Sequence, residues 1–233
     1  VLAVGLGLGT KTFDLLPDHW KTYEAEVTFG VQTDTEDIWG NVLKTHDVSK
    51  TPEEIIQAIC SFGGTYDQIP PMYSAKKIDG KKLYQLAREG KIVERKAVPV
   101  TLKDIQVLSV KDNKARFIVT CSAGTYIRTL CVDIGKKLGC EACMSSLTRV
   151  IAGGFSKEQA LTLEKIKELA DKNELESRLI SIDTALGHFP KVIASNEFEK
   201  QLKNGNAIGS NAVLGLQEAS IDVCSHDICV RLY

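Results

Sequence analysis

The chain has 233 residues, of which 43% are hydrophobic and 25% are charged, and its formal net charge is −1. This is long enough for one large domain with a substantial core and a second, smaller one. No apolar stretch is long enough to span a bilayer, and the apolar start at residues 1–9 has no basic region before it, so it does not have the pattern of a signal peptide.

The seven cysteines are odd in number and follow no signal peptide, which favours reduced thiols in a cytoplasmic protein. Cys140 and Cys143 form a C-x-x-C pair, and Cys224 and Cys229 flank His226. Zinc would need a second pair of ligands next to the first, whereas these two sites are far apart in the sequence. We therefore expect no metal, and we interpret the cysteines as small core residues.

Two strands are predicted in the first part of the chain. Residues 1–10 are an apolar run that ends in glycines, which predicts a short buried strand. The glycines do not fit a dinucleotide fingerprint, because the third falls one position early and no βαβ unit follows. Residues 21–33 alternate between apolar and polar side chains, which predicts a half-buried strand followed by the polar loop 33–37. The residues expected on its apolar face are Tyr23, Ala25, Val27, Phe29 and Val31.

Residues 51–54 have the signals of a helix start, with Thr51 as the cap, Pro52 at the first position and Glu54 completing a capping box. Gly63 and Gly64 end the helix. Its apolar stripe consists of Ile55, Ile56, Ile59 and Phe62.

The middle of the chain continues with an extended segment at 68–73, because its prolines exclude a helix, and a short helix at 82–89 that Gly90 closes. Further elements follow from apolar periodicity and turn residues. They are strands at 98–110 and 115–121 joined by the turn 111–114, a helix from Ile127 to Leu138 ended by Gly139, a strand at 147–155, and a helix from Thr162 to about Ala170.

Helices and strands are mixed without a βαβ rhythm, which predicts an α+β fold whose sheet is largely antiparallel and flanked by helices. After Pro190 the pattern changes to a short helix capped by Ser195 and ended at Gly205, followed by small apolar segments. We expect a large domain at 1–188 and a small β-rich module at 189–233.

Three features of the sequence suggest chemistry. The first is the segment from Lys76 to Lys96, which carries eight basic and three acidic residues and is therefore +5, leaving −6 for the rest of the chain. Basic residues interleaved with tyrosines suit a looped RNA, where rings stack on bases and ammonium groups meet phosphates. A solvated helix face with ordinary surface lysines is the alternative.

The second feature is Arg128, which follows Gly124 and Tyr126 between a strand and a helix. An arginine beside an apolar strand needs a counter-charge. Either it forms a structural ion pair with Asp133 or Asp183, or it orients a catalytic carboxylate.

The third feature is Tyr23, which lies on the predicted strand at 21–33. In a core, its hydroxyl would need a hydrogen-bonding partner. In a site, its ring could stack on a base.

Three long motifs resemble those of the bacterial TruB-type tRNA pseudouridine-55 synthases. They are residues 21–37 (K-T-Y-E-A-E-V-T-F-G-V-Q-T-D-T-E-D), 69–88 (I-P-P-M-Y-S-A-K-K-I-D-G-K-K-L-Y-Q-L-A-R) and 121–139 (C-S-A-G-T-Y-I-R-T-L-C-V-D-I-G-K-K-L-G), and the short run L-T-R-V at 147–150 matches as well. The resemblance covers about residues 1–190 in the same order. It implies a pseudouridine synthase domain followed by an RNA-binding PUA-like module, of which residues 195–208 resemble the beginning.

The resemblance also implies roles for individual residues. Tyr23 corresponds to the tyrosine that stacks on the target base and takes part in proton transfer. Arg128 corresponds to the arginine that pairs with the catalytic aspartate, with Tyr126 near that pair, and Leu147 to the apolar wall of the uracil pocket. The predicted RNA-binding residues are Met72, Tyr73, Lys76, Lys77, Lys81, Lys82 and Arg88.

The family's nucleophile is an aspartate in a Leu-Asp-Pro-x-Ala-x-Gly segment just before the strand that Val1 begins. We expect this nucleophile upstream of Val1, and we expect residues 1–233 to be inactive without it. Asp34 and Asp37 belong to a different motif of the family.

The reaction implied is the isomerisation of the T-loop uridine at position 55 of tRNA to pseudouridine, by a monomeric cytoplasmic enzyme that needs no metal or cofactor and binds no membrane. Two alternatives remain. One is a non-catalytic tRNA-binding or tRNA-folding protein. The other is a hydrolase that uses Asp34 and Asp37 as a carboxylate pair.

Overall fold

The computed structural model describes residues 1–16, 20–78, 80–209, 212–214 and 230–232. The chain forms two compact units, one made of residues 1–3 and 18–160 and the other of residues 4–17 and 161–233. No helix among the described residues is both long and apolar enough to cross a membrane. The domain boundary expected at residue 188 stays a prediction.

The first unit is built on one six-stranded sheet in the order β10-β9-β1-β8-β7-β4, and every neighbouring pair is antiparallel. This confirms the predicted α+β fold with a largely antiparallel sheet. The strands are β1 (Lys21–Phe29), β4 (Gly64–Gln68), β7 (Val98–Lys111), β8 (Lys114–Cys121), β9 (Ala142–Ala152) and β10 (Phe155–Ser156).

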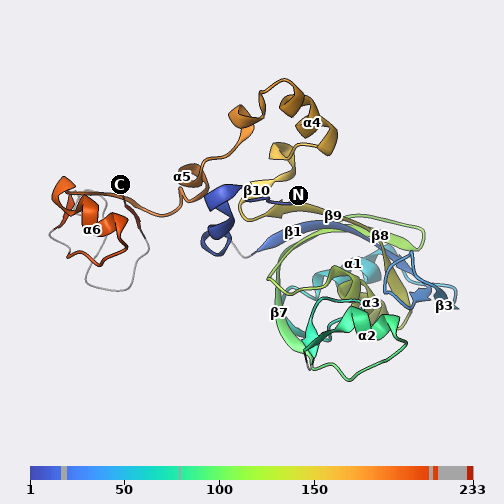
Figure 1. The fold of residues 1–233 in the computed structure, drawn as a ribbon. Helices are drawn as coiled ribbons and strands as arrows, with labels where there is room; N and C mark the ends of the chain where they lie inside the picture. Colours follow the sequence, from blue (N-terminus) through green and yellow to red (C-terminus); the bar gives the residue numbers. More distant parts are fainter. Residues whose placement is uncertain (17–19, 79, 210–211, 215–229, 233) are drawn as a thin grey trace. The chain divides into compact units, whose positions relative to one another are not determined.

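Two helices cover one face of this sheet, α1 (Pro52–Cys60) and α3 (Ile127–Leu138). Figure 1 shows the sheet curving around them and around the short helix α2 (Leu83–Arg88). The core lies between sheet and helices and includes Val27, Phe29, Ile55, Ile59, Phe117, Leu130 and Ile134, all of them at most 1% exposed. The predicted capping box of α1 is present, and α3 ends where Gly139 adopts the left-handed conformation.

Small hairpins extend from this unit. Gly30, at φ +82°, divides the strand predicted at 21–33 into β1 and β2 (Val31–Thr33), and β2 pairs with β3 (Val42–Thr45). A second hairpin, β5 (Lys77–Ile78) with β6 (Lys81–Lys82), leads directly into α2. The unit also contains the 3-10 turn η3 (Lys157–Gln159).

The second unit is largely helical where it is described, with a small sheet in the order β12-β11-β13. Its elements are η1 (Gly7–Lys11), η2 (Phe13–Leu15), α4 (Leu163–Asp171), η4 (Leu175–Arg178), α5 (Ile182–Ala185), β11 (Lys191–Ala194), η5 (Asn196–Phe198), α6 (Glu199–Lys203), β12 (Val213–Leu214) and β13 (Arg231–Leu232). The identification of residues 189–233 as a PUA-like module stays a prediction.

Three sequence predictions about these elements need correction. The buried strand at 1–10 was wrong, because no strand among the described residues pairs with this segment, and Leu2, Val4, Leu6 and Leu8 are exposed. Ile56 was expected in the core but is exposed, because Ile55 and Ile59, four residues apart, already form the buried face of α1. The strand predicted from Leu147 begins at Ala142, which is buried against α3.

The cysteines are free thiols at the five described positions, Cys60, Cys121, Cys131, Cys140 and Cys143. The described residues contain no group of three or more His, Cys, Asp or Glu side chains that could hold a metal ion. Cys224, His226 and Cys229 lie outside the described residues.

Candidate active site

Helix α3 begins at a side-chain clamp that fixes the position of Tyr126. Gln68, at the end of β4, is fully buried, and its Oε1 accepts a hydrogen bond from the Tyr126 backbone N–H at 2.8 Å. Its Nε2 donates to the Tyr126 carbonyl at 3.1 Å and to the Tyr66 hydroxyl at 2.6 Å. A helix start leaves backbone N–H groups without helical partners, and Gln68 satisfies the one at Tyr126. The clamp therefore fixes the start of α3, two residues before Arg128.

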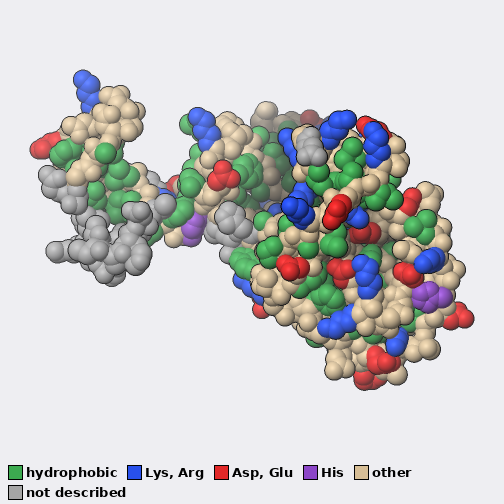
Figure 2. Space-filling model, turned by 90° about the horizontal axis from the view of Figure 1, so that it is seen from below, with side chains coloured by type: hydrophobic (Ala, Val, Ile, Leu, Met, Phe, Trp, Pro, Cys, Tyr) green, Lys and Arg blue, Asp and Glu red, His purple; other side chains and the backbone are tan. Residues whose placement is uncertain are grey.

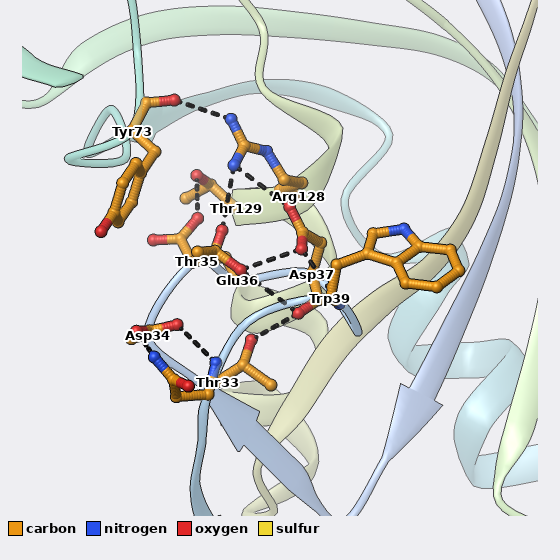
Figure 3. A network of polar contacts seen from close by, with 10 residues as sticks. Thr33, Asp34, Thr35, Glu36, Asp37, Trp39, Tyr73, Arg128 and Thr129 are labelled. Carbon is orange, nitrogen blue, oxygen red and sulfur yellow. Dashed lines mark hydrogen bonds and ion pairs between the residues drawn. The ribbon is translucent and has the colours of Figure 1, made fainter. Parts of the chain in front are cut away.

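Arg128 reaches from the first turn of α3 to two separate loops. Its Nη1 donates to the Asp37 carboxylate at 3.3 Å and to the Thr35 carbonyl at 3.0 Å, and its Nη2 donates to the Tyr73 carbonyl at 2.7 Å. The side chains of Arg128 and Asp37 are only 23% and 18% exposed. Figure 3 shows the guanidinium between the backbone of Tyr73 and the loop that carries Asp37. Because a planar guanidinium forms several directed bonds at once, this geometry fixes both loops relative to α3.

The loop at residues 33–41 is held by its own side chains. Thr33 donates to the Asp37 carbonyl at 2.7 Å and Thr35 to the Asp37 carboxylate at 2.9 Å, while the backbone and side-chain N–H groups of Asn41 bind the Asp34 carboxylate, each at 2.8 Å. The backbone N–H of Trp39 donates to Asp37 at 3.2 Å, and its indole is 87% exposed. The Asp37 carboxylate is therefore fully engaged in positioning, with Arg128, Thr35 and Trp39 all bonded to it.

Glu36 lies on the inner side of the same loop. It adopts the left-handed conformation at φ +67°, which is uncommon for a residue other than glycine, and its carboxylate accepts a hydrogen bond from Thr129 at 2.6 Å. Burial raises the pKa of Glu36, and the Thr129 bond and the charges of Arg128 and Arg95 oppose this only in part. Glu36 lines a cavity of about 270 Å³ together with Phe62, Tyr66, Asp67, Ile69, Arg95, Thr129, Asp133 and Lys136.

Tyr23 and Leu147 lie on one face of the sheet. In the register of β1 with β9, Tyr23 is opposite Arg149 and Ala25 is opposite Leu147, so these four side chains point to the same side. Ala25 on this side is buried in the same cluster as Ile127 and Leu130, and Tyr23 packs against that cluster. Leu147 on the same side is 40% exposed. The residue opposite the half-buried Tyr23 is a cation, Arg149, which acts to lower the pKa of the Tyr23 hydroxyl.

The basic segment at 76–96 forms the β5–β6 hairpin and α2. The ring of Tyr84 lies beneath two cations, with Lys82 Nζ at 5.7 Å and Arg88 Cζ at 5.3 Å from its centroid. Near the C-terminal end of the segment, the Arg95 side chain donates a hydrogen bond to the Pro70 carbonyl at 3.0 Å. The side chains of Lys77, Lys81 and Arg88 are exposed, while Lys76 and Lys82 are partly buried. On the face of the larger unit shown in Figure 2, Lys and Arg alternate with acidic side chains, so charge there is mixed.

Comparison with known proteins agrees with this geometry. The model of the TruB family pseudouridylate synthase N-terminal domain matches residues 1–127, and that of the tRNA pseudouridylate synthase B C-terminal domain matches residues 128–187. The chain belongs to the TruB family of pseudouridylate synthases. It is therefore an isomerase of the pseudouridine synthase class.

Proteins named tRNA pseudouridine synthase B are similar along nearly the whole chain. The protein from Alkaliphilus oremlandii is 44% identical over 232 residues, which are 100% of this chain and 76% of that one. The protein from Clostridium novyi is 44% identical over 214 residues, covering 92% of this chain and 73% of that one.

Among solved structures, a chain of a Cbf5-Nop10-Gar1 complex superposes with a TM-score of 0.63 at 24% identity and covers 89% of this chain. A chain of an H/ACA RNP bound to a substrate RNA containing 2'-deoxyuridine superposes with a TM-score of 0.61 at 22% identity and covers 88%. This chain spans about half the length of each, 55% and 53%. These likenesses show the pseudouridine synthase fold.

The structure brings the predicted TruB-type residues into two groups. Tyr23 and Leu147 share a sheet face, and Arg128, Tyr126 and the backbone of Tyr73 meet at the start of α3. Among the described residues, no hydrogen bond joins Arg128 to Tyr23. Their assembly around one uracil stays a prediction, as does RNA binding by Met72 and by the basic residues of segment 76–96.

Both structural alternatives for Arg128 were wrong. Asp133 pairs with Lys136 on the same helix at 3.1 Å, and Asp183 pairs with Arg231 in the second unit at 2.7 Å. The carboxylate next to Arg128 is Asp37. Sequence reasoning missed this role, along with those of Gln68, Glu36 and Arg149. The available signal was the T-D-T-E-D run of residues 33–37, whose threonine and acidic side chains suit a loop held by its own side chains.

Proposed function

We propose that this protein converts the uridine at position 55 of the tRNA T loop to pseudouridine. The observation that carries the proposal is the arrangement of Arg128, a half-buried arginine at the start of α3 that Asp37 and two backbone carbonyls hold in one orientation. The reaction detaches uracil from C1′ of the ribose, rotates it and rejoins it through C5. A preorganised cation suits this chemistry, because it can orient a carboxylate and stabilise developing charge without reorganising.

Asp37 is unsuited to act as the nucleophile itself. A carboxylate that attacks a substrate must be able to approach it, whereas the Asp37 carboxylate is bonded to its own loop through Thr35 and the Trp39 backbone and to α3 through Arg128. Asp34 is likewise bonded twice by Asn41, which argues against a hydrolase built on this pair. We therefore assign the attack to the aspartate that the TruB family carries in the segment preceding the position of Val1. Val1 is bonded to Arg149, the residue opposite Tyr23.

Two energetic terms support extrusion of the target base. Flipping a base out of its stack costs a few kcal/mol. A stacked aromatic ring returns about 1–3 kcal/mol per base, and Tyr23 is proposed to provide it. Phosphate contacts from the exposed basic residues of segment 76–96 would supply the remainder, although the protein as a whole has a net charge of −1.

The proposal is tested with a tRNA transcript that carries tritium at C5 of its uridines, since rejoining through C5 releases the label. The active enzyme, meaning a chain that carries the family's nucleophile segment before Val1, should release tritium from a transcript with uridine at position 55 and not from one with cytidine there. Arg128→Ala should abolish release while leaving transcript binding within a few-fold. Arg116→Gln is the matched control, because Arg116 pairs with Glu24 elsewhere on the sheet.

The outcomes separate the two functions. Binding without any tritium release by the active enzyme would identify a non-catalytic tRNA-binding or tRNA-folding protein. Release that survives Arg128→Ala would refute the assigned role of the arginine.

The basic segment has its own test. Lys81→Gln and Lys82→Gln should each weaken transcript binding. Each should also reduce the steepness of the fall of log K, the association constant, with log salt concentration by about 1. Lys114→Gln is the control, because Lys114 is the first residue of β8 and pairs with Glu26. Equal slopes for all three variants would show that the segment does not contact phosphates.

A further inference from the structure

We propose that Arg149 is a positioning residue for the isomerisation, holding the Tyr23 phenol and the Val1 backbone in one fixed arrangement. The inference rests on the proposed function, because it concerns the tyrosine assigned to the target base. Arg149 belongs to the L-T-R-V run, in which only Leu147 had a predicted role.

The first observation is the sheet register. Arg149 on β9 lies directly opposite Tyr23 on β1, and a register shift between Thr22 and Tyr23 sets this pairing. Such irregularities re-aim side chains and are common beside active sites. Without the shift Tyr23 would not face Arg149, so the pairing depends on a local departure from regular sheet geometry.

The second observation is that Arg149 binds two partners. Its side chain interacts with the Tyr23 hydroxyl across the strand pair, and its Nε donates to the Val1 carbonyl at 2.6 Å. The Val1 nitrogen donates in return to the Arg149 carbonyl at 2.7 Å. Arg149 on β9 therefore connects Tyr23 on β1 to the backbone of Val1.

The groups around the Tyr23 hydroxyl show how Arg149 affects its pKa. Burial raises the pKa of Tyr23, and the nearby Cys121 thiol from β8 acts in the same direction. Arg149, the cation opposite it on β9, acts against both and lowers the pKa. Arg149 thus holds the pKa of the Tyr23 hydroxyl below the value that burial alone would give.

A double-mutant cycle in the active enzyme tests the proposal, with single-turnover tritium release as the rate and filter binding as the affinity. Arg149→Gln should slow release by about tenfold to a hundredfold, the range expected for a lost charged hydrogen bond, with affinity within about twofold. In a Tyr23→Phe background the same change should cost much less, because the partner hydroxyl is already gone. Arg149→Lys should recover part of the rate.

The pH profile of the single-turnover rate adds a readout that a purely structural role would not move. Loss of Arg149 raises the pKa of Tyr23 further, so the alkaline rise of the rate should shift to higher pH in Arg149→Gln and disappear in Tyr23→Phe. Arg116→Gln should match the unmodified enzyme in both assays, since Arg116 pairs with Glu24 on the opposite face of β1.

Each result decides the question. The role of Arg149 would be overturned if Arg149→Gln slowed tritium release equally with and without the Tyr23 hydroxyl. It would also be overturned if Arg149→Gln left the rate unchanged. If Arg149→Gln does not fold, the cycle is run with Arg149→Lys, which keeps the charge but cannot bind both partners. Absence of tritium release from uridine 55 in the unmodified enzyme would instead overturn the proposed function.

Discussion

The Arg128 guanidinium and the Asp37 carboxylate lie 3.3 Å apart, Nη1 to Oδ2, although 91 residues separate them in the chain. Asp37 accepts bonds from its own loop as well, so its carboxylate connects loop 33–41 to helix α3. Because Arg128 also binds the Tyr73 carbonyl, the pair organises three segments around one cation.

Asp37→Asn should lower kcat by about tenfold to a hundredfold with little change in KM, because Arg128 loses its counter-charge and its orientation but the RNA contacts remain. Asp133→Asn is the control, since Asp133 is a carboxylate on the same helix that pairs only with Lys136 among the ion pairs of the described residues. The comparison is made from steady-state tritium release. Equal kcat values for the two variants would contradict the role of the pair.

Gln68→Leu should destabilise the protein by about 1–3 kcal/mol, because it leaves the Tyr126 N–H and carbonyl without their buried partner. Urea unfolding provides the measurement. Thr65→Val, which removes an exposed hydrogen bond to Thr101 on the same strand pair, should cost much less. A similar loss in both variants would show that the clamp contributes nothing beyond an ordinary strand contact.

Glu36→Gln should make stability less dependent on pH. The pKa of Glu36 is raised in the folded state, so its contribution to stability is complete below the unfolded value of about 4.3 and is lost as pH rises through the folded value. Glutamine can still accept the bond from Thr129 and carries no charge. The variant should therefore gain stability relative to the native chain near neutral pH and lose that advantage in acid. Urea unfolding of both proteins across this pH range measures the difference in stability. A difference in favour of Glu36→Gln that grows in acid would contradict the prediction.

Gly40→Ala should reduce activity more than stability. A Cβ at this position would meet the Thr35 Oγ1 and the Asp34 carboxylate, both of which hold the loop that carries Asp37. The loop must then shift, and Arg128 loses its acceptors. Gly63→Ala is the control, because a Cβ there would lie 3.4 Å from its nearest neighbour, the Cys60 carbonyl. Thermal unfolding and tritium release are compared for both variants, and full activity in Gly40→Ala would contradict the expected displacement.

Local signals in the sequence predicted much of the fold. The capping box at Thr51, the apolar spacing from Ile127 to Leu138 and the turn between β7 and β8 are all determined within a few residues, so they could be predicted without knowing the rest of the chain. The segment at 1–10 shows the limit of this approach. Its apolar residues suit a strand, but a strand also needs a neighbour to pair with, and only the fold determines whether one is present.

The candidate site was predictable only in part, for a related reason. Resemblance identified Arg128, whereas its partner is chosen by the way α3 and loop 33–41 pack together. Asp133 and Asp183 were reasonable candidates in the sequence, but each is bonded elsewhere. Arg149 likewise meets Tyr23 only because the register of β1 and β9 shifts at Thr22, and no local pattern predicts such a shift.

The exposed indole of Trp39 makes the loop observable in solution. The chain has two tryptophans, and the other, Trp20, lies under Lys103 at 4.4 Å from the ring centroid. Replacing Trp20 with phenylalanine would leave one tryptophan, whose backbone N–H is bonded to the carboxylate that holds Arg128. Its emission and its quenching by iodide would then report arrival of the substrate within two residues of Asp37, with no dye and no modified RNA.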